Sequence, residues 1–234
     1  MLGACTTWRP VPPVVPLPSD SAFAWPSVLD QAVDAGGRVD FQRLAATRGA
    51  LDIAVAAIAQ ADLASMPGRA ERLAFLVNAS NTLWVYAVVR GGIPDRLGPL
   101  DRADLLRLSR FDVAGQERTL DSLQRDAILP LADGPGGWRV PLALYCPAVS
   151  CPRLARTPYA AAGLDAALEA AARRFLSDPA NVILDPAARI VRVSALMAPA
   201  PGLLATLNRY RTIPVPLDYR VEPLPFDWTL AQAP

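Results

Sequence analysis

The 234-residue sequence contains no histidine and no lysine. Histidine is the side chain that most often acts as a general base near neutral pH, and lysine forms Schiff bases with carbonyl substrates. Their absence removes the usual partner of a cysteine nucleophile and excludes lysine-based covalent catalysis. The net charge is only +1, so the chain also lacks the basic excess of a protein that follows a phosphate backbone. We therefore expect no nucleic-acid partner.

Cysteine is scarce too, with only Cys5, Cys146 and Cys151. The last two form a C-x4-C pair, which is not the C-x-x-C spacing of thioredoxin-like redox proteins. Without histidine, a tetrahedral zinc site would need acidic ligands. The sequence also contains no Walker or Rossmann glycine pattern. It therefore predicts neither a metal site nor an organic cofactor.

The composition that remains, 52% hydrophobic and 19% charged residues, is typical of a globular protein. The stretch from about Arg69 to Arg90 is apolar on nearly every face, which predicts a helix that is buried all round and begins at Pro67. The apolar run is too short and too often interrupted to span a membrane. An amphipathic helix at 157–177 and hairpins at 111–120 and 182–193 complete the pattern. We expect a mostly helical single α+β domain over residues 21–234, with a small, mainly antiparallel sheet and two hairpins.

Three shorter elements can also be predicted. Ser27 is expected to cap the first helix, and Gly49 is expected to break the helical stretch at 41–64. Residues 215–223 are interrupted by prolines and can form only an edge strand or a strap.

The stretch from Trp138 to Leu154, WRVPLALYCPAVSCPRL, is the candidate site. We expect 140–145 to be a buried strand that ends before Pro147, because proline cannot donate to a strand ladder. Loops that follow strands often display reactive groups. Cys146 or Cys151 would be a nucleophile only if a base, a cation or a helix N-terminus lowered its pKa. The alternative that we favour is a disulfide or two inert thiols, because a turn can bring the two α-carbons within ~4.4–6.8 Å.

Asn78 and Asn81 lie three residues apart, on one face of the long helix. A buried amide without partners costs about 1–3 kcal/mol, so both should be hydrogen-bonded. They could orient a site loop, or they could fasten the helix to neighbouring backbone. We favour the second interpretation.

Residues 1–20 are expected to form a membrane tether. Leu2, Gly3, Ala4 and Cys5 resemble the lipobox of a bacterial lipoprotein, and a proline-rich spacer follows. Lipidation of Cys5 would leave an even number of cysteines, and an oxidising periplasm would favour a bridge between them. We expect attachment in the periplasm or at the outer membrane, with the lipid on Cys5 as the only membrane contact.

Four stretches together resemble the domain-of-unknown-function family 547, whose members are often secreted or envelope-attached. This chain departs from the family pattern at several polar or aromatic positions. It has Ser80 where the family usually has tyrosine and Leu76 where it has an aromatic residue. Gln124-Arg125 stand in place of a Glu-His pair, Pro141 replaces histidine, and 197–201 replaces an aromatic-rich segment. The stretches that carry the resemblance are Leu73–Leu83, Val113–Leu131, Leu142–Leu154 and Phe226–Leu230.

The asparagines, the loop cysteines and a terminal Asp-Trp pair are retained, whereas the titratable side chains are missing. The resemblance thus implies a non-catalytic descendant that binds a small ligand or an envelope protein. The alternative is a papain-like or transglutaminase-like hydrolase or transferase, with Cys151 or Cys146 as its nucleophile. The expected binding residues are Asn78, Asn81, Ser150, Arg153, Asp227 and Trp228.

Overall fold

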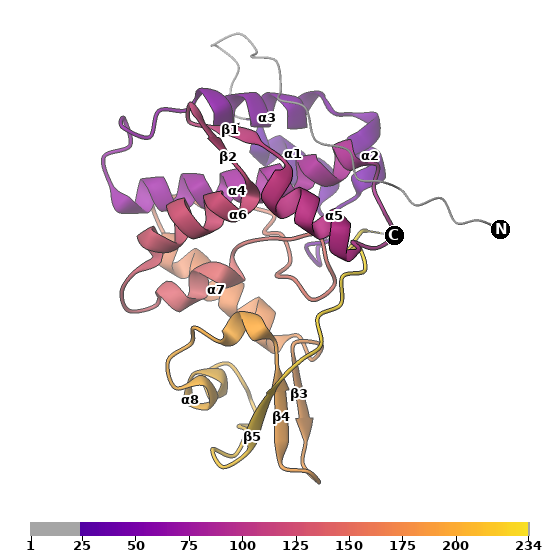
Figure 1. Cartoon of the computed structure of the whole chain (residues 1–234). Coiled ribbons are helices and arrows are strands. Elements are labelled where there is room, and N and C mark those ends of the chain that lie inside the picture. The colour runs from indigo at the N-terminus through magenta and orange to yellow at the C-terminus, as the bar shows by residue number, and fades with distance from the viewer. Residues whose placement is uncertain (1–23, 234) are drawn as a thin grey trace, which may run out of the picture.

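Helix α4, Arg69–Gly91, runs through the middle of the helical part of the molecule (Figure 1). The computed structural model describes residues 24–233. The short helices α1, α2 and α3 pack around α4 together with the irregular helical segment that follows α6, so α4 is buried on nearly every face, as predicted. The helix begins after Gly68 rather than at Pro67, and it ends where Gly92 adopts a left-handed conformation with φ of 98°. The first helices are α1 Trp25–Ala32, α2 Phe41–Ala46, α3 Gly49–Gln60, α5 Pro99–Ala103 and α6 Leu120–Ser122.

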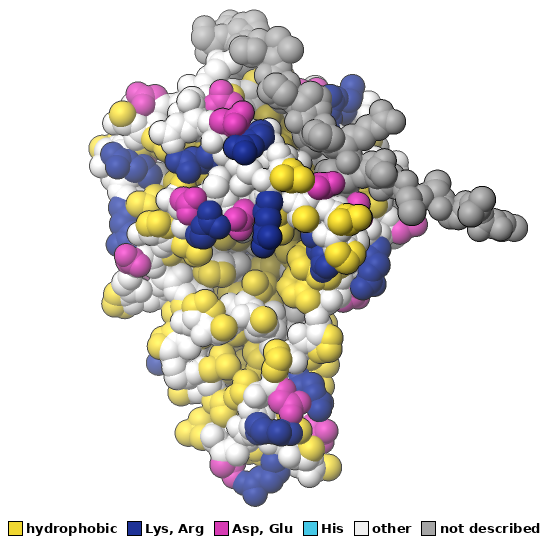
Figure 2. All heavy atoms as spheres, in the orientation of Figure 1, with side chains coloured by type: hydrophobic (Ala, Val, Ile, Leu, Met, Phe, Trp, Pro, Cys, Tyr) yellow, Lys and Arg dark blue, Asp and Glu magenta, His cyan; other side chains and the backbone are white. Residues whose placement is uncertain are grey.

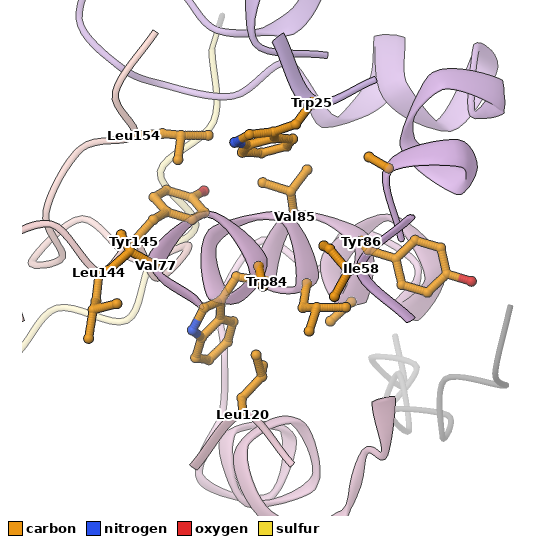
Figure 3. Packing of buried hydrophobic residues seen from close by; sticks show 14 of the residues in the cluster. Trp25, Ile58, Val77, Trp84, Val85, Tyr86, Leu120, Leu144, Tyr145 and Leu154 are labelled. Atoms are coloured by element: carbon orange, nitrogen blue, oxygen red, sulfur yellow. The ribbon is translucent and has the colours of Figure 1, made fainter. Parts of the chain in front are cut away.

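The buried side chains on α4 meet partners from both directions (Figure 3). Val85 lies next to Trp25 of α1, and Val77 lies near Tyr145, which like Leu154 comes from the irregular stretch 143–163. Trp84 lies on another side of α4, close to Leu120. Segments that are far apart in the sequence thus share one hydrophobic core around α4.

A second core lies below the first, between helix α7 and a three-stranded sheet (Figure 1). Strands β3 and β4 form the predicted antiparallel hairpin, and β5 pairs in parallel with β4 at the edge. The predicted edge strand within 215–223 is therefore confirmed, as is the hairpin of β1 and β2. The mostly helical α+β class is also confirmed. The remaining elements are β1 Phe111–Val113, β2 Gln116–Arg118, α7 Leu164–Ser177, β3 Val182–Asp185, β4 Ile190–Val193, α8 Leu203–Asn208 and β5 Arg220–Pro223.

Five irregular helical turns connect these elements. Those that follow α5 and α6 are π-helical, and the other three are 3₁₀ turns. In chain order they are η1 Asp104–Leu108, η2 Leu123–Ile128, η3 Leu129–Ala132, η4 Gly137–Leu142 and η5 Ala195–Met197.

The strand predicted at 140–145 is wrong. Its first residues belong to the 3₁₀ turn η4, which contains Pro141, and the rest is irregular. A short apolar run is compatible with either a buried strand or a buried helical turn, so its periodicity could not decide between them. The backbone of this segment is paired with the side chain of Asn81 instead of with a strand.

Two predicted helix starts also differ. Helix α1 begins at Trp25 with Pro26 in its first turn, and Ala24 precedes it without any side-chain cap. Ser27 lies inside the helix, where its hydroxyl accepts a hydrogen bond from Gln31 at 2.7 Å. The amphipathic helix α7 starts at Leu164 instead of Thr157, because the preceding segment lies in an extended path over the core.

Arg139 links the two cores. Its side chain is 11% exposed, and its guanidinium pairs with Asp165 and with Glu169, both on α7. Tyr210 donates a hydrogen bond of 2.9 Å to the same Glu169. These contacts fix the turn η4 against α7, and the next segment of the chain carries both cysteines.

Raising the pH above 10 should destabilise the fold through Tyr145 and Tyr159. Burial raises the pKa of Tyr159 to about 12, against a smaller opposing effect of the Arg174 guanidinium, and burial also raises the pKa of Tyr145. Both tyrosines ionise near pH 10 in an unfolded chain. Above that pH the unfolded state therefore binds fewer protons than the folded state, and the free energy of unfolding falls as the pH rises. For Tyr159 alone we expect a loss of about 2 kcal/mol at about pH 11.5, measured by urea unfolding.

Tyr145→Phe is a matched control for this effect. Within residues 24–233 the Tyr145 hydroxyl is buried without a hydrogen-bond partner, so its removal should leave stability near neutral pH unchanged. The variant should lose less stability than the parent at alkaline pH. An equal alkaline loss in both proteins would show that Tyr145 is not buried as described.

Candidate functional site

The loop from Cys146 to Cys151, here called the cysteine loop, is a closed turn. The two sulfur atoms lie at disulfide-bonding distance, and the α-carbons are 5.5 Å apart, within the range that a bridge requires. The backbone N–H of Cys151 donates to the carbonyl of Ala148 at 3.0 Å, and Cys151 is only 2% exposed. A thiol in this position would be poorly accessible to a substrate.

The C-terminal segment, residues 226–233, covers the cysteine loop. The N–H of Val149 donates to the carbonyl of Thr229 at 2.9 Å, and the N–H of Ala231 donates to the carbonyl of Pro147 at 2.9 Å. Ser150 makes two further bonds with Asp227, because its N–H donates to the Asp227 carbonyl and its hydroxyl accepts from the Asp227 N–H. The polar atoms of the loop are thus used to hold this segment.

Asp227 and Trp228 fasten the C-terminal segment to the loop after α4 and to α5, respectively. The Asp227 carboxylate accepts a hydrogen bond of 2.9 Å from the Thr229 N–H, and it lies 3.6 Å from Arg96. The hydrogen bonds from Thr229, with a smaller contribution from Arg96, hold the pKa of Asp227 below its usual range, so it stays ionised and is a weak base. The Trp228 ring lies 4.4 Å from the Arg102 guanidinium.

Asn78 and Asn81 use both polar atoms of their amides in bonds to backbone. Asn78 donates to the Tyr159 carbonyl at 2.7 Å and accepts from the Tyr159 N–H at 2.9 Å. Asn81 donates to the Ala143 carbonyl at 3.1 Å and accepts from the Tyr145 N–H at 2.8 Å. This geometry fits the fastening interpretation, in which two asparagines hold the segments on either side of the cysteine loop.

Two of the positions that depart from the family pattern, Ser80 and Gln124, meet at α4. The Gln124 amide donates to the Ser80 hydroxyl at 3.1 Å, so the place of a Glu and a Tyr is taken by two side chains that do not titrate. Arg125 points outward and pairs with Asp121 and Asp126. Sequence reasoning identified these positions as departures, but it did not predict that they meet.

Cys151 also lines a small cavity of about 20 Å³, together with Arg153, Arg174 and Asp178. A cavity of this size holds about one water molecule and not a substrate. The carboxylate of Asp178 accepts a hydrogen bond of 2.9 Å from the Ala180 N–H. Within residues 24–233, no hydrogen bond joins a carboxylate to either sulfur.

A larger pocket, of about 390 Å³, opens on the other side of Arg153. Its walls come from the loop after α1, the segment after the cysteine loop and helix α7. The sequence singled out Arg153 but missed Arg156, Arg174 and Tyr159, which line the same pocket. No spacing pattern could have found them together, because only the fold brings α7 next to the loop after α1.

The predicted site residues therefore fall into three groups. Cys146, Cys151, Ser150 and Asp227 lie together at the cysteine loop, the two asparagines fasten its flanks, and Arg153 belongs to the larger pocket. Cys5 and the tether at 1–20 lie outside the described residues. Within residues 24–233, no group of three or more Cys, Asp or Glu residues is placed to hold a metal ion. None of the helices described there is both long enough and apolar enough to cross a bilayer.

Residues 63–176 match the family model described as "Protein of unknown function, DUF547". The matched region contains α4, the cysteine loop and most of α7, but neither the three-stranded sheet nor the Phe226–Leu230 stretch. No curated protein and no solved structure matches the chain. From the start of the α4 region to the end of α7, the chain thus resembles the DUF547 family of proteins of unknown function.

Proposed function

We propose that this protein is a non-catalytic binding protein attached to the bacterial cell envelope. The observation that carries the proposal is the closed cysteine loop. Its sulfurs lie at bonding distance, Cys151 is 2% exposed, and the C-terminal segment takes up the loop's polar atoms. A cysteine nucleophile needs a free thiolate and a base. A bridge between Cys146 and Cys151 leaves no free thiolate, and the chain contains no histidine to act as the base.

The size of the space beside Cys151 supports the same proposal. Small-molecule sites in proteins usually enclose about 300–1,000 Å³, far more than the cavity of about 20 Å³ that Cys151 lines. Asp227, the acidic residue bonded to the cysteine loop, is held in its ionised form. The residues retained at this site therefore suit a stable binding surface better than an active site that transfers protons.

Envelope attachment rests on the sequence and on the cysteine pair. The lipobox-like residues Leu2–Cys5 and the proline-rich spacer suit a lipid-anchored tether, and a bridged pair suits an oxidising compartment. On the face shown in Figure 2, arginines and acidic residues alternate without forming a large basic patch. That distribution favours a small ligand or a protein partner over nucleic acid.

Thiol titration of protein prepared without reductant tests the proposal. Because only Cys5 would lie outside the bridge, the unfolded chain should contain at most one reactive thiol before reduction, that of Cys5 where it carries no lipid, and should gain two on reduction. The Cys146→Ser/Cys151→Ser double variant should give the same count before reduction and should not gain thiols on reduction.

Two reactive thiols at Cys146 and Cys151 in the folded protein would contradict the proposal. Turnover of a peptide, ester or amide that disappears in Cys151→Ala would establish the hydrolase or transferase alternative instead. Cell fractionation of the protein expressed from its own gene, with and without Cys5→Ser, separately tests the anchor.

A further inference from the structure

The pocket of about 390 Å³ beside the cysteine loop is lined by three arginines and by no acidic residue. Arg153 and Arg156 come from the segment after the cysteine loop, and Arg174 comes from α7. Three cationic side chains that share a concave wall repel one another unless an anion lies between them. The arrangement is therefore more favourable with an anion bound than without one.

These arginines are poorly neutralised by the protein itself. Within residues 24–233, no carboxylate lies within 4.0 Å of Arg153 or Arg174. Arg156 lies 3.8 Å from Asp30, but both side chains are more than half exposed, so this pair is weak. In contrast, the neighbouring Arg173 pairs with Glu169 at 3.1 Å and does not line the pocket.

A glycine turn in the loop after α1 packs directly against the segment that carries Arg153. Gly37 has a φ of 75°, and a β-carbon there would lie 2.8 Å from the β-carbon of Arg153 and 2.6 Å from the carbonyl oxygen of Leu154. The Leu154 N–H donates to the Gly37 carbonyl at 3.1 Å. Only glycine allows this close approach, and the contact holds Arg153 against the loop after α1.

The segment that carries Arg153 supplies further hydrogen-bond donors. Ala155 and Thr157 line the pocket, and their backbone N–H groups have no hydrogen-bond partner among residues 24–233. Backbone N–H groups beside guanidinium groups are common in phosphate sites. The rest of the lining is largely apolar and includes Leu154, Pro158 and Tyr159.

We propose that this pocket binds a small organic phosphate. The phosphate group lies among Arg153, Arg156 and Arg174, whose guanidinium groups suit its charge and its oxygen geometry. The organic part lies against the apolar wall, since a volume of about 390 Å³ exceeds what a phosphate alone fills. This inference rests on the proposed binding function and specifies its ligand class.

Phenyl phosphate is a suitable probe, with inorganic phosphate, benzoate and phenol as comparators. In titration calorimetry at low salt, we expect phenyl phosphate to bind most tightly and phenol not to bind. Arg174→Gln should weaken binding about tenfold, the effect of losing one charge-assisted contact. Arg173→Gln is the matched control, because it makes the same charge change at the adjacent position and should leave affinity within about twofold.

The outcomes separate this inference from the proposed function. Absence of binding, or equal weakening by Arg173→Gln and Arg174→Gln, would overturn the pocket assignment. Equal affinity for benzoate or for inorganic phosphate would overturn the organic-phosphate specificity. Circular dichroism and thermal unfolding of each variant would show whether it is folded. The thiol titration reports only on the cysteine loop, and the calorimetry reports only on the pocket. Either experiment can therefore give its expected result when the other does not.

Discussion

Asn81→Leu should lower the free energy of unfolding by about 3–5 kcal/mol. Leucine has the same branching and the same number of side-chain heavy atoms as asparagine, but it cannot bond to the Ala143 carbonyl or to the Tyr145 N–H. Both of these residues are buried, at 4% and 2% exposure, so the two backbone groups would be left without partners away from water. Each buried group that loses its partner costs about 1–3 kcal/mol. Urea unfolding followed by circular dichroism measures the change.

Asn208 provides a matched comparison for Asn81. Its amide makes the same kind of paired hydrogen bonds, donating to the Val215 carbonyl at 2.8 Å and accepting from the Val215 N–H at 2.8 Å. Asn208 itself is only partly buried, but Val215 is 1% exposed, so the N–H and carbonyl of Val215 would likewise lose their partners away from water, and Asn208→Leu should also cost about 3–5 kcal/mol. If Asn208→Leu proved nearly neutral, the loss of partners for buried backbone groups would not be the reason that the Asn81 bonds matter.

The second large effect is expected at Arg139. Arg139→Met keeps much of the buried side-chain volume but removes the charge that pairs with Asp165 and Glu169. Among residues 24–233, Glu169 then keeps Tyr210 and the more exposed Arg173 as partners. Breaking a largely buried ion pair from one side costs several kcal/mol, and because both carboxylates are partly exposed we expect about 2–4 kcal/mol. Thermal unfolding would show this as a lower midpoint.

Asp165→Asn tests whether burial or ion pairing alone explains the Arg139 effect. The Asp165 side chain is 85% exposed, whereas that of Arg139 is 11% exposed. Removing the exposed partner should therefore cost less than about 1 kcal/mol. Similar losses in the two variants would show that the pair acts as a surface ion pair and does not hold η4 against α7.

The parts of the fold that could be predicted from the sequence are those with local signals. Helix α4 is long and apolar on nearly all faces, and Gly91-Gly92 mark its end. Its existence and its length could therefore be predicted from the sequence. The β3–β4 hairpin has two apolar runs around an Asp-Pro turn. The segment at 140–145 lacks such a signal, because its conformation depends on bonds from Asn81, more than fifty positions earlier.

The candidate site was predictable to a similar extent. The cysteine loop and the two asparagines stand out by residue type, and the structure brings them into one region. The larger pocket does not stand out, because arginines are common in this chain and nothing in the sequence distinguishes Arg174 from Arg173. The two arginines lie on different faces of α7. Arg173 lies beside Glu169 and Tyr210, whereas Arg174 lines the pocket with Tyr159.

The pairing between the cysteine loop and the C-terminal segment has a consequence for the order of folding. The two cysteines are 5 positions apart, so they meet by closing a very short loop, whereas 226–233 must find partners in remote parts of the chain. Closing short loops precedes distant pairing, because less chain entropy is lost. We therefore expect the two cysteines to meet early, so that the final residues dock onto a loop that is already closed where an oxidant has formed the bridge. A chain kept reduced during refolding should acquire its helices normally but complete this last docking step slowly.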